Sequence, residues 1–235
     1  VFESGTWYKP THGDEITQTT SEHTGALWIE TPDTAVYIQP GAVVYGRIRF
    51  TSAATGSSVV GYGAIIDCFA DNRIMDIRQG GTEGGGKYNA TYKSQMMQNS
   101  ASNFLYDGPT IMDARSFHIV TGGNNVRVRN YKAMSTMMTT DGITEGVKAN
   151  GVFEHCWLYV GDNALVISGS TGSYYNDIVI GTTCAAVFPQ GNVTNALLEN
   201  ISVFRSNDGI INHRYNPNNK DLALTMTVRN FDCVD

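Results

Sequence analysis

Short runs of β-branched and aromatic residues recur along this chain, and helical periodicity is nearly absent. From residue 117 the spacing becomes regular, with a repeat of roughly 19 to 29 residues, which falls within the range of solenoid repeats. The runs cover residues 117–120, 126–131, 151–156, 177–180, 196–203 and 224–231. Each alternates apolar with polar side chains and precedes a turn, so each is expected to be a strand with one apolar face.

Such a unit cannot bury its apolar face alone, and stacking on its neighbours is what would stabilise it. An antiparallel sandwich also has short strands at turn-rich intervals. Against the sandwich, the repeats look alike in register, and the Asn-Gly or Asp-Gly turns of hairpins are scarce. We therefore predict an all-β fold, a right-handed parallel β-helix (solenoid).

The 235 residues are expected to form a single β-helix domain, residues 1–235. Residues 78–102 lack periodicity and contain a glycine-rich stretch, which predicts a long loop excursion from one rung. The chain begins at Val1 rather than at a methionine and stops at Asp235, just after a strand-like run. We expect it to be part of a longer chain.

Charge and composition exclude several kinds of partner. The formal net charge is −6 and no Lys/Arg cluster is present to neutralise phosphates, so nucleic acid is not expected as a partner. No apolar stretch approaches the roughly 20 residues that a membrane span needs. Three Asn-x-Ser/Thr sequons, at Asn89, Asn192 and Asn200, fit a secreted or extracellular protein. The oligomeric state stays open.

The cysteines do not have the spacing of a zinc site, because none forms a Cys-x-x-Cys pair. No His/Asp/Glu cluster has metal-ligand spacing either, and no cofactor is expected. Cys156 and Cys184 lie near corresponding points of successive repeats. They are read either as stacked core thiols or as a disulfide, and buried thiols are favoured because free cysteine packs as a small hydrophobe. Cys68 and Cys233 complete the set of four.

Two short segments carry the chemistry. Asp141 lies in Thr-Thr-Asp-Gly-Ile (139–143) and Asp162 in Gly-Asp-Asn-Ala (161–164), about one repeat apart. Equivalent positions on adjacent rungs are separated by about 4.8 Å, so the two carboxylates are expected to converge on one groove. Two facing carboxylates are the minimum equipment for acid/base hydrolysis of a glycosidic bond. The alternative is that both are simply turn residues.

The order Thr-Asp-Gly-Ile, then Gly-Asp-x-Ala before an apolar strand (165–168), resembles the catalytic region of β-helical glycoside hydrolases. These are the polygalacturonases and the dextranase/isopullulanase family. Residues 36–46 and 61–65 are similar to the dextranase and isopullulanase N-terminal rungs. The resemblance implies an inverting hydrolase in which Asp162 is the general acid and Asp141 a base. Inverting sites separate these carboxyl groups by roughly 6.5–9.5 Å, and a neighbouring carboxylate keeps the acid protonated near neutrality.

Asn163 departs from that family, which has a second acid directly after the first. An amide holds a water by hydrogen bonds but cannot accept its proton. Three explanations of this asparagine stay open. Asp141 alone suffices as the base, the protein is a non-catalytic relative, or Asn163 was introduced to trap substrate. The Gly-His-Gly and Arg-x-Lys motifs of polygalacturonases are absent from the corresponding residues 185–192 and 207–215. A neutral glucan is therefore expected rather than a pectic substrate.

Candidate substrate-binding residues are Tyr159, Gln190, His213 and Arg214, each of which is alternatively an ordinary surface or turn residue. The leading hypothesis is an endo-acting, inverting, dextranase-like glycoside hydrolase that acts on a polysaccharide. The alternative is a non-catalytic carbohydrate-binding or structural β-helix, such as a spike or surface protein, with a decayed acid site. A polysaccharide lyase is disfavoured, because the sequence has neither a recognisable Ca²⁺ site nor a recognisable Lys or Arg that would abstract a proton beside a uronate. His118 and His155 fall inside strand patterns and are expected to be core or ladder residues.

Overall fold

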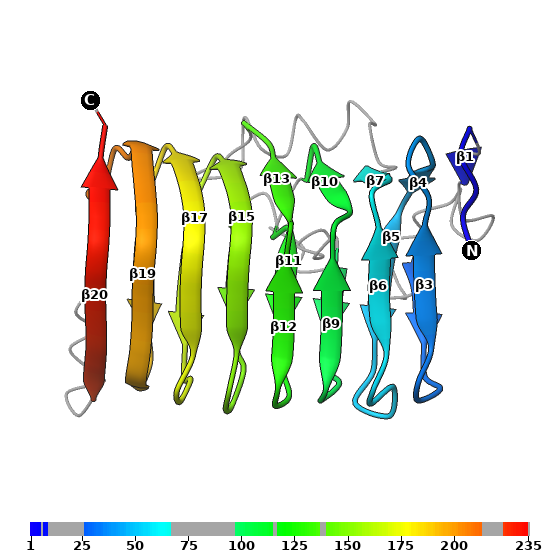
Figure 1. Cartoon of the computed structure of the whole chain (residues 1–235), viewed down its shortest axis with the longest axis horizontal. Coiled ribbons are helices and arrows are strands. Elements are labelled where there is room, and N and C mark those ends of the chain that lie inside the picture. The colour runs from blue at the N-terminus through cyan, green and yellow to red at the C-terminus, as the bar shows by residue number, and fades with distance from the viewer. Residues whose placement is uncertain are drawn as a thin grey trace, which may run out of the picture.

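The structure, a computed structural model, describes residues 1–5, 7–8, 26–66, 97–114, 117–136, 140–212 and 223–234. These residues form a stack of parallel strands, in which each rung pairs with the rung before it and the rung after it. Figure 1 shows the rungs side by side along the long axis, with the N-terminus at one end and the C-terminus near the other. The predicted all-β parallel β-helix is confirmed, and the described residues include no helix.

The strands form two sheets. Sheet A has 13 strands and sheet B has seven. Sheet A contains β1 (Trp7–Tyr8), β3 (Ala35–Ile38), β4 (Val43–Tyr45), β6 (Ser58–Gly61), β7 (Ala64–Ile66), β9 (Phe104–Asp107), β10 (Thr110–Met112), β12 (Val126–Arg129), β13 (Lys132–Met134), β15 (Val152–Val160), β17 (Tyr174–Thr182), β19 (Val193–Arg205) and β20 (Leu224–Cys233). Sheet B contains β2 (Ala26–Ile29), β5 (Arg47–Phe50), β8 (Met97–Asn99), β11 (Ile119–Thr121), β14 (Ile143–Glu145), β16 (Leu165–Ser168) and β18 (Val187–Gln190).

Alternation along each strand fills the interior of the solenoid. In β12, Val126 and Val128 are buried, whereas Arg127 between them is exposed. The same period of two repeats on neighbouring rungs, so apolar side chains stack into one continuous core. Aromatic side chains are part of this core, and Phe153 stacks on Tyr175 of the next rung with ring centroids 4.9 Å apart.

Sheet A is bent along a single line of residues with positive φ. This bend column comprises Gly61, Gly108, Asn130, His155, Asp177, Asn200 and Asn230. In the earlier rungs it separates two short strands, such as β12 and β13, whereas β15, β17, β19 and β20 run through it. Gly and Asn tolerate this left-handed conformation better than most residues. The bend column therefore fixes where each rung changes direction.

An asparagine ladder runs along the turns that lead from sheet B to the next rung. Asn125 Nδ2 donates to Asn103 Oδ1 at 2.9 Å, and Asn150 Nδ2 donates to Asn125 Oδ1 at 3.0 Å. All three residues have positive φ. The ladder satisfies side-chain amides on successive rungs and holds the turns in register.

Most of the expected excursion over residues 78–102 lies outside the described residues. Its described end differs from the expectation, because residues 97–99 form β8 and pair in parallel with β5 and β11. Met97 and Asn99 both point inward and are buried, and so short a strand carries little periodicity. Within the described ranges, no helix has the length and apolar character to cross a membrane.

The described cysteines are free thiols rather than a disulfide. Cys156 is buried in the core, as predicted, whereas Cys184 is only partly buried and Cys233 is exposed. Cys68 lies outside the described residues. Cys156 and Cys184 are not stacked on one another, because Cys156 pairs with Ile178 on the next rung.

Candidate active site

The two candidate carboxylates lie where the chain turns from sheet A into sheet B. Ile143 of β14 is opposite Leu165 of β16, and this register continues backward through the turn. Gly142 N–H donates to the Asn163 carbonyl at 3.0 Å. Asp141 is therefore level with Asn163 on the next rung, and Asp162 is one residue earlier. The structure brings together the three residues that the sequence predicted to form the site.

Asn163 bridges the two carboxyl groups. Its backbone N–H donates to Asp141 Oδ1 at 3.1 Å and to Asp162 Oδ1 at 2.9 Å. Its side-chain Nδ2 lies 3.0 Å from Asp162 Oδ1 and 3.5 Å from Asp141 Oδ1. Because one N–H contacts both oxygens at hydrogen-bonding distance, the two Oδ1 atoms lie no more than about 6 Å apart.

Asp141 retains a proton on a substantial fraction of molecules near neutral pH. Its side chain is buried, with 6% of the residue exposed, whereas Asp162 is half-buried. Burial, and to a smaller extent the negative charge of Asp162, together raise the pKa of Asp141 to about 7. The hydrogen bonds from Asn163 and Thr144 oppose this rise in pKa without cancelling it. The site thus offers a neutral carboxylic acid beside a second carboxyl group.

Threonine hydroxyls fix the turn that carries Asp162. Gly161 N–H donates to Thr140 Oγ1 at 3.0 Å, and Thr183 Oγ1 donates to the Gly161 carbonyl at 2.7 Å. The Thr182 hydroxyl donates to the Asp162 carbonyl. Side chains on the rungs before and after it therefore hold the backbone of this turn, which fixes the position of the Asp162 backbone.

Gly142 is required by the neighbouring rung. A Cβ at this position would lie 2.6 Å from the carbonyl oxygen of Ala164, which is backbone and cannot move aside.

His118 lies directly behind the pair. The ring is fully buried and its Nδ1 is 3.0 Å from the Asp141 carbonyl oxygen. Burial lowers the pKa of His118 to about 4, so the ring is neutral at physiological pH. His118 is a core residue, as predicted, and it supports the backbone of Asp141 rather than reaching a substrate.

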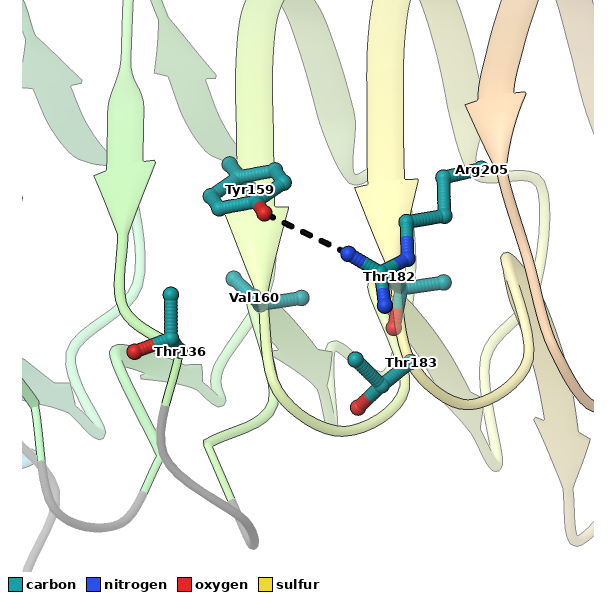
Figure 2. A pocket seen from close by; sticks show the side chains of 6 residues that line it. All are labelled: Thr136, Tyr159, Val160, Thr182, Thr183 and Arg205. Atoms are coloured by element: carbon teal, nitrogen blue, oxygen red, sulfur yellow. Dashed lines mark hydrogen bonds between the residues drawn. The ribbon is translucent and has the colours of Figure 1, made fainter.

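A surface pocket of about 210 Å³ adjoins this turn. Figure 2 shows Tyr159 on one wall and Arg205 reaching from β19 across β17 toward it, with Thr182 and Thr183 between them. Arg205 Nη1 lies 3.5 Å from the Tyr159 hydroxyl. Thr182 and Thr183 also donate to the Asp162 and Gly161 carbonyls, so two residues that line the pocket contact the backbone of the turn that carries Asp162.

Gly181 lets the ring of Tyr159 stack on a second aromatic ring. Tyr159 and Phe204 stack with centroids 6.2 Å apart and an interplanar angle of 7°. A Cβ on Gly181 would lie 2.3 Å from Phe204 Cζ and 2.9 Å from Tyr159 Cδ2. Tyr159, a predicted substrate-binding residue, thus lines the pocket that adjoins the turn carrying Asp162. Arg205 and Phe204 were not predicted from the sequence. Their only signal there is an aromatic residue followed by a cation at the end of a strand.

A third carboxyl group extends the site by two rungs. The register places Cys184 level with Asp162, and Cys184 Sγ donates to Asp208 Oδ2 at 3.0 Å. Burial and the hydrogen bond to Asp208 raise the pKa of the Cys184 thiol to about 12. The thiol is thus a protonated hydrogen-bond donor rather than a nucleophile. Asp208 was not identified from sequence, although Asp208-Gly209-Ile210 repeats the Asp-Gly-Ile of residues 141–143.

Of the other predicted substrate-binding residues, the structure describes only Gln190, which it does not bring to this turn. Gln190 is exposed on β18 opposite Ser168, at the far end of the strands that begin beside the carboxyl pair. His213 and Arg214 lie outside the described residues. Among the residues that the structure describes, no group of three or more His, Cys, Asp or Glu side chains is arranged to hold a metal ion.

Comparison with known proteins leaves the chain without an assigned family. No protein family matches it. No curated protein matches it either.

Proposed function

We propose that this protein hydrolyses glycosidic bonds of a polysaccharide, a neutral glucan, at the Asp141–Asp162 pair. The observation that carries the proposal is the pairing of a buried carboxyl group, whose pKa is raised to about 7, with a second, half-buried carboxyl group; their Oδ1 atoms lie within about 6 Å of each other. Tyr159 supplies an aromatic surface in the pocket that adjoins the turn carrying Asp162. The preference for a glucan rests on the resemblance of the N-terminal rungs to dextranases.

Because the pKa of Asp141 is raised, we assign the general acid to Asp141 and the base to Asp162, the reverse of the roles expected from the sequence. Asp141 donates its proton to the leaving glycosidic oxygen as the C–O bond breaks. Asp162 accepts a proton from the water whose oxygen forms the new bond to the anomeric carbon. A proton returned from Asp162 through solvent to Asp141 then restores the starting state.

The stereochemical outcome tests this arrangement further. A separation of roughly 6.5–9.5 Å between the two carboxyl groups is typical of inverting enzymes, whereas a separation of about 5–5.5 Å is typical of retaining enzymes. The Oδ1 limit lies below the inverting window. Inversion, which the family resemblance implies, therefore requires that a bound sugar displace Asn163 Nδ2 and that the two carboxyl groups rotate apart. Proton NMR of the first-formed product anomer distinguishes inversion from retention.

The same bridge supports a second candidate function. Asn163 occupies Oδ1 of both carboxyl groups and cannot itself accept a proton. This favours a non-catalytic β-helix that binds a polysaccharide at a site where hydrolysis has been lost. The second candidate predicts glucan binding without product.

The deciding experiment measures reducing-sugar release from dextran, pullulan and other glucans by the parent protein and by Asp162→Ala, Asp141→Asn and Asn163→Asp. We expect turnover by the parent and at least a 100-fold loss of kcat in the first two variants, on the scale of lost general acid/base catalysis. No turnover by the parent or by Asn163→Asp would refute hydrolysis. Activity of Asn163→Asp alone would establish the second candidate.

A further inference from the structure

A trough lies on the outer surface of sheet A, along the bend column. It encloses about 370 Å³ and is separate from the Tyr159 pocket. Its side chains come from four rungs: Tyr62 at one end, then Lys132, His155 with Trp157, and Asp177. This volume falls within the range of about 300–1,000 Å³ that is typical of small-molecule sites.

The trough owes its shape to the bend. His155 and Asp177 have φ of 52° and 53°, so the backbone turns at these residues and their side chains project from the corner. Gly108 leaves its rung without a side chain. A Cβ there would lie 2.0 Å from the Gly61 carbonyl oxygen and 3.1 Å from Tyr62 Cε1. Tyr62 therefore leans across this gap and forms the end wall, with 66% of its surface exposed.

Polar groups with spare hydrogen-bonding capacity line the trough. Lys132 is exposed and forms no ion pair within the described ranges. Asn130 donates to Asp107 Oδ1 at 2.8 Å, which fixes its side chain and leaves its own Oδ1 as an acceptor. His155 Nε2 lies 3.8 Å from Asp177 Oδ2, beyond hydrogen-bonding distance, and both side chains are about half exposed or more. Donors and acceptors thus alternate within one site.

Aromatic surface accompanies these groups. Trp157 is half-buried on β15 and lies 6.0 Å from Tyr159 between ring centroids, at an angle of 25°. Trp157 and Tyr62, which lies between β6 and β7, both line the trough. Amphipathic rings beside mixed donors and acceptors suit a ligand with apolar ring faces and many hydroxyl groups.

The charges argue against an anionic ligand. Arg127 and Arg129, the nearest cations on the adjoining half of sheet A, already pair with Glu154 and Asp107. The trough itself holds one lysine and one aspartate, so their charges cancel. A phosphate or a polyanion would meet no cluster of positive charge.

We propose that the trough is a second saccharide-binding site, which takes a neutral oligosaccharide of two to three sugars and lies apart from the Asp141–Asp162 pair. Lys132, His155 and Asp177 bind sugar hydroxyl groups, and Trp157 and Tyr62 contact the ring faces. The proposal does not depend on hydrolysis at the carboxyl pair, because it concerns binding alone.

The test is titration of ¹⁵N-tryptophan-labelled protein with isomaltotriose and with maltotriose. The chain has three tryptophans, and Trp157→Phe assigns the indole N–H signal of Trp157. The titration is done in Asp162→Asn, so that no sugar is consumed. We expect one of the two sugars to shift the Trp157 signal in a saturable way. Tyr62→Ala and Lys132→Ala should each weaken that binding at least tenfold.

Tyr37→Ala is the matched control, since Tyr37 is another exposed tyrosine outside the lining of the trough. It should leave the dissociation constant unchanged. Circular dichroism melts confirm that each variant is folded. No saturable shift with either sugar, or a shift that Tyr62→Ala and Lys132→Ala leave unchanged, would overturn the proposal. Loss of turnover in the reducing-sugar assay would not bear on it.

Discussion

Glu145 gives the sharpest test of the electrostatics inside this solenoid. Its side chain is fully buried and accepts hydrogen bonds from the hydroxyl groups of Ser173 and Tyr175. Burial raises the pKa of Glu145 from 4.5 to about 7, although both hydroxyl groups act to lower it. The folded protein therefore keeps a proton on Glu145 at pH values where the unfolded chain has lost it.

The sign of the effect follows from this difference in bound protons. Between about pH 4.5 and pH 7 the folded state binds more protons, so the free energy of unfolding falls as pH rises through this window. From pH 5 to pH 8 the Glu145 contribution amounts to about 2–3 kcal/mol. His118 acts in the opposite direction. Its pKa is lowered to about 4 by burial, so its contribution to stability grows as pH rises toward 6.5.

Because these contributions overlap, the pH dependence of the parent protein alone does not isolate Glu145. Glu145→Gln does, since the amide keeps the shape of the side chain and cannot ionise. We expect the free energy of unfolding of Glu145→Gln, relative to the parent, to increase by about 2–3 kcal/mol between pH 5 and pH 8. Urea denaturation at pH 5, 6.5 and 8 measures it.

Glu199→Gln is the matched control. Glu199 also accepts a tyrosine hydroxyl, from Tyr174 at 3.0 Å, but it is only partly buried. Its substitution removes a tyrosine–carboxyl hydrogen bond outside the buried core, so it measures the effect of losing that bond without the effect of full burial. If Glu145→Gln and the parent showed parallel pH profiles, the reasoning from burial to a retained proton would be wrong.

Three further outcomes are expected. Hydrolysis should decline as pH rises through about 7, because Asp141 then loses the proton that it donates, and a kcat/KM profile against pH measures this limb. Gly142→Ala should lower the free energy of unfolding by about 1–3 kcal/mol, since its Cβ meets the Ala164 backbone, and thermal melts would contradict this if the midpoint were unchanged. Iodoacetamide at pH 8 should modify exposed Cys233 faster than Cys184, whose thiol has a pKa of about 12; equal rates by mass spectrometry would refute the assigned hydrogen bonding.

The sequence predicts the solenoid because its longest strands carry the signal. Runs such as 151–156 and 196–203 have clear alternation, and both lie in the continuous strands β15 and β19. The strands of sheet B are three or four residues long, which is too short to display a period. Met97–Asn99 was therefore assigned to a loop. The bend at His155 could not be predicted either, because a histidine in a sequence does not indicate a residue of positive φ as a glycine does.

From the sequence, only those members of the site could be predicted that fall in a short recognisable motif on their own rung. Asp141 and Asp162 were found because each falls in a short motif separated by one repeat. The bridge by Asn163 depends on a one-residue offset between rungs, which no spacing argument resolves. Arg205 and Asp208 come from later rungs of variable length, so their position beside the turn follows only from the register.

The asparagine ladder has a consequence for how sequences of this shape vary. Asn125 takes part in two side-chain hydrogen bonds of the ladder, as a donor to Asn103 and as an acceptor from Asn150, whereas each of those residues takes part in one. Removal of the middle amide leaves two neighbours without a partner, and removal of an end amide leaves one. Substitution should therefore be tolerated least at the middle position of the ladder, Asn125, and better at its two ends, Asn103 and Asn150.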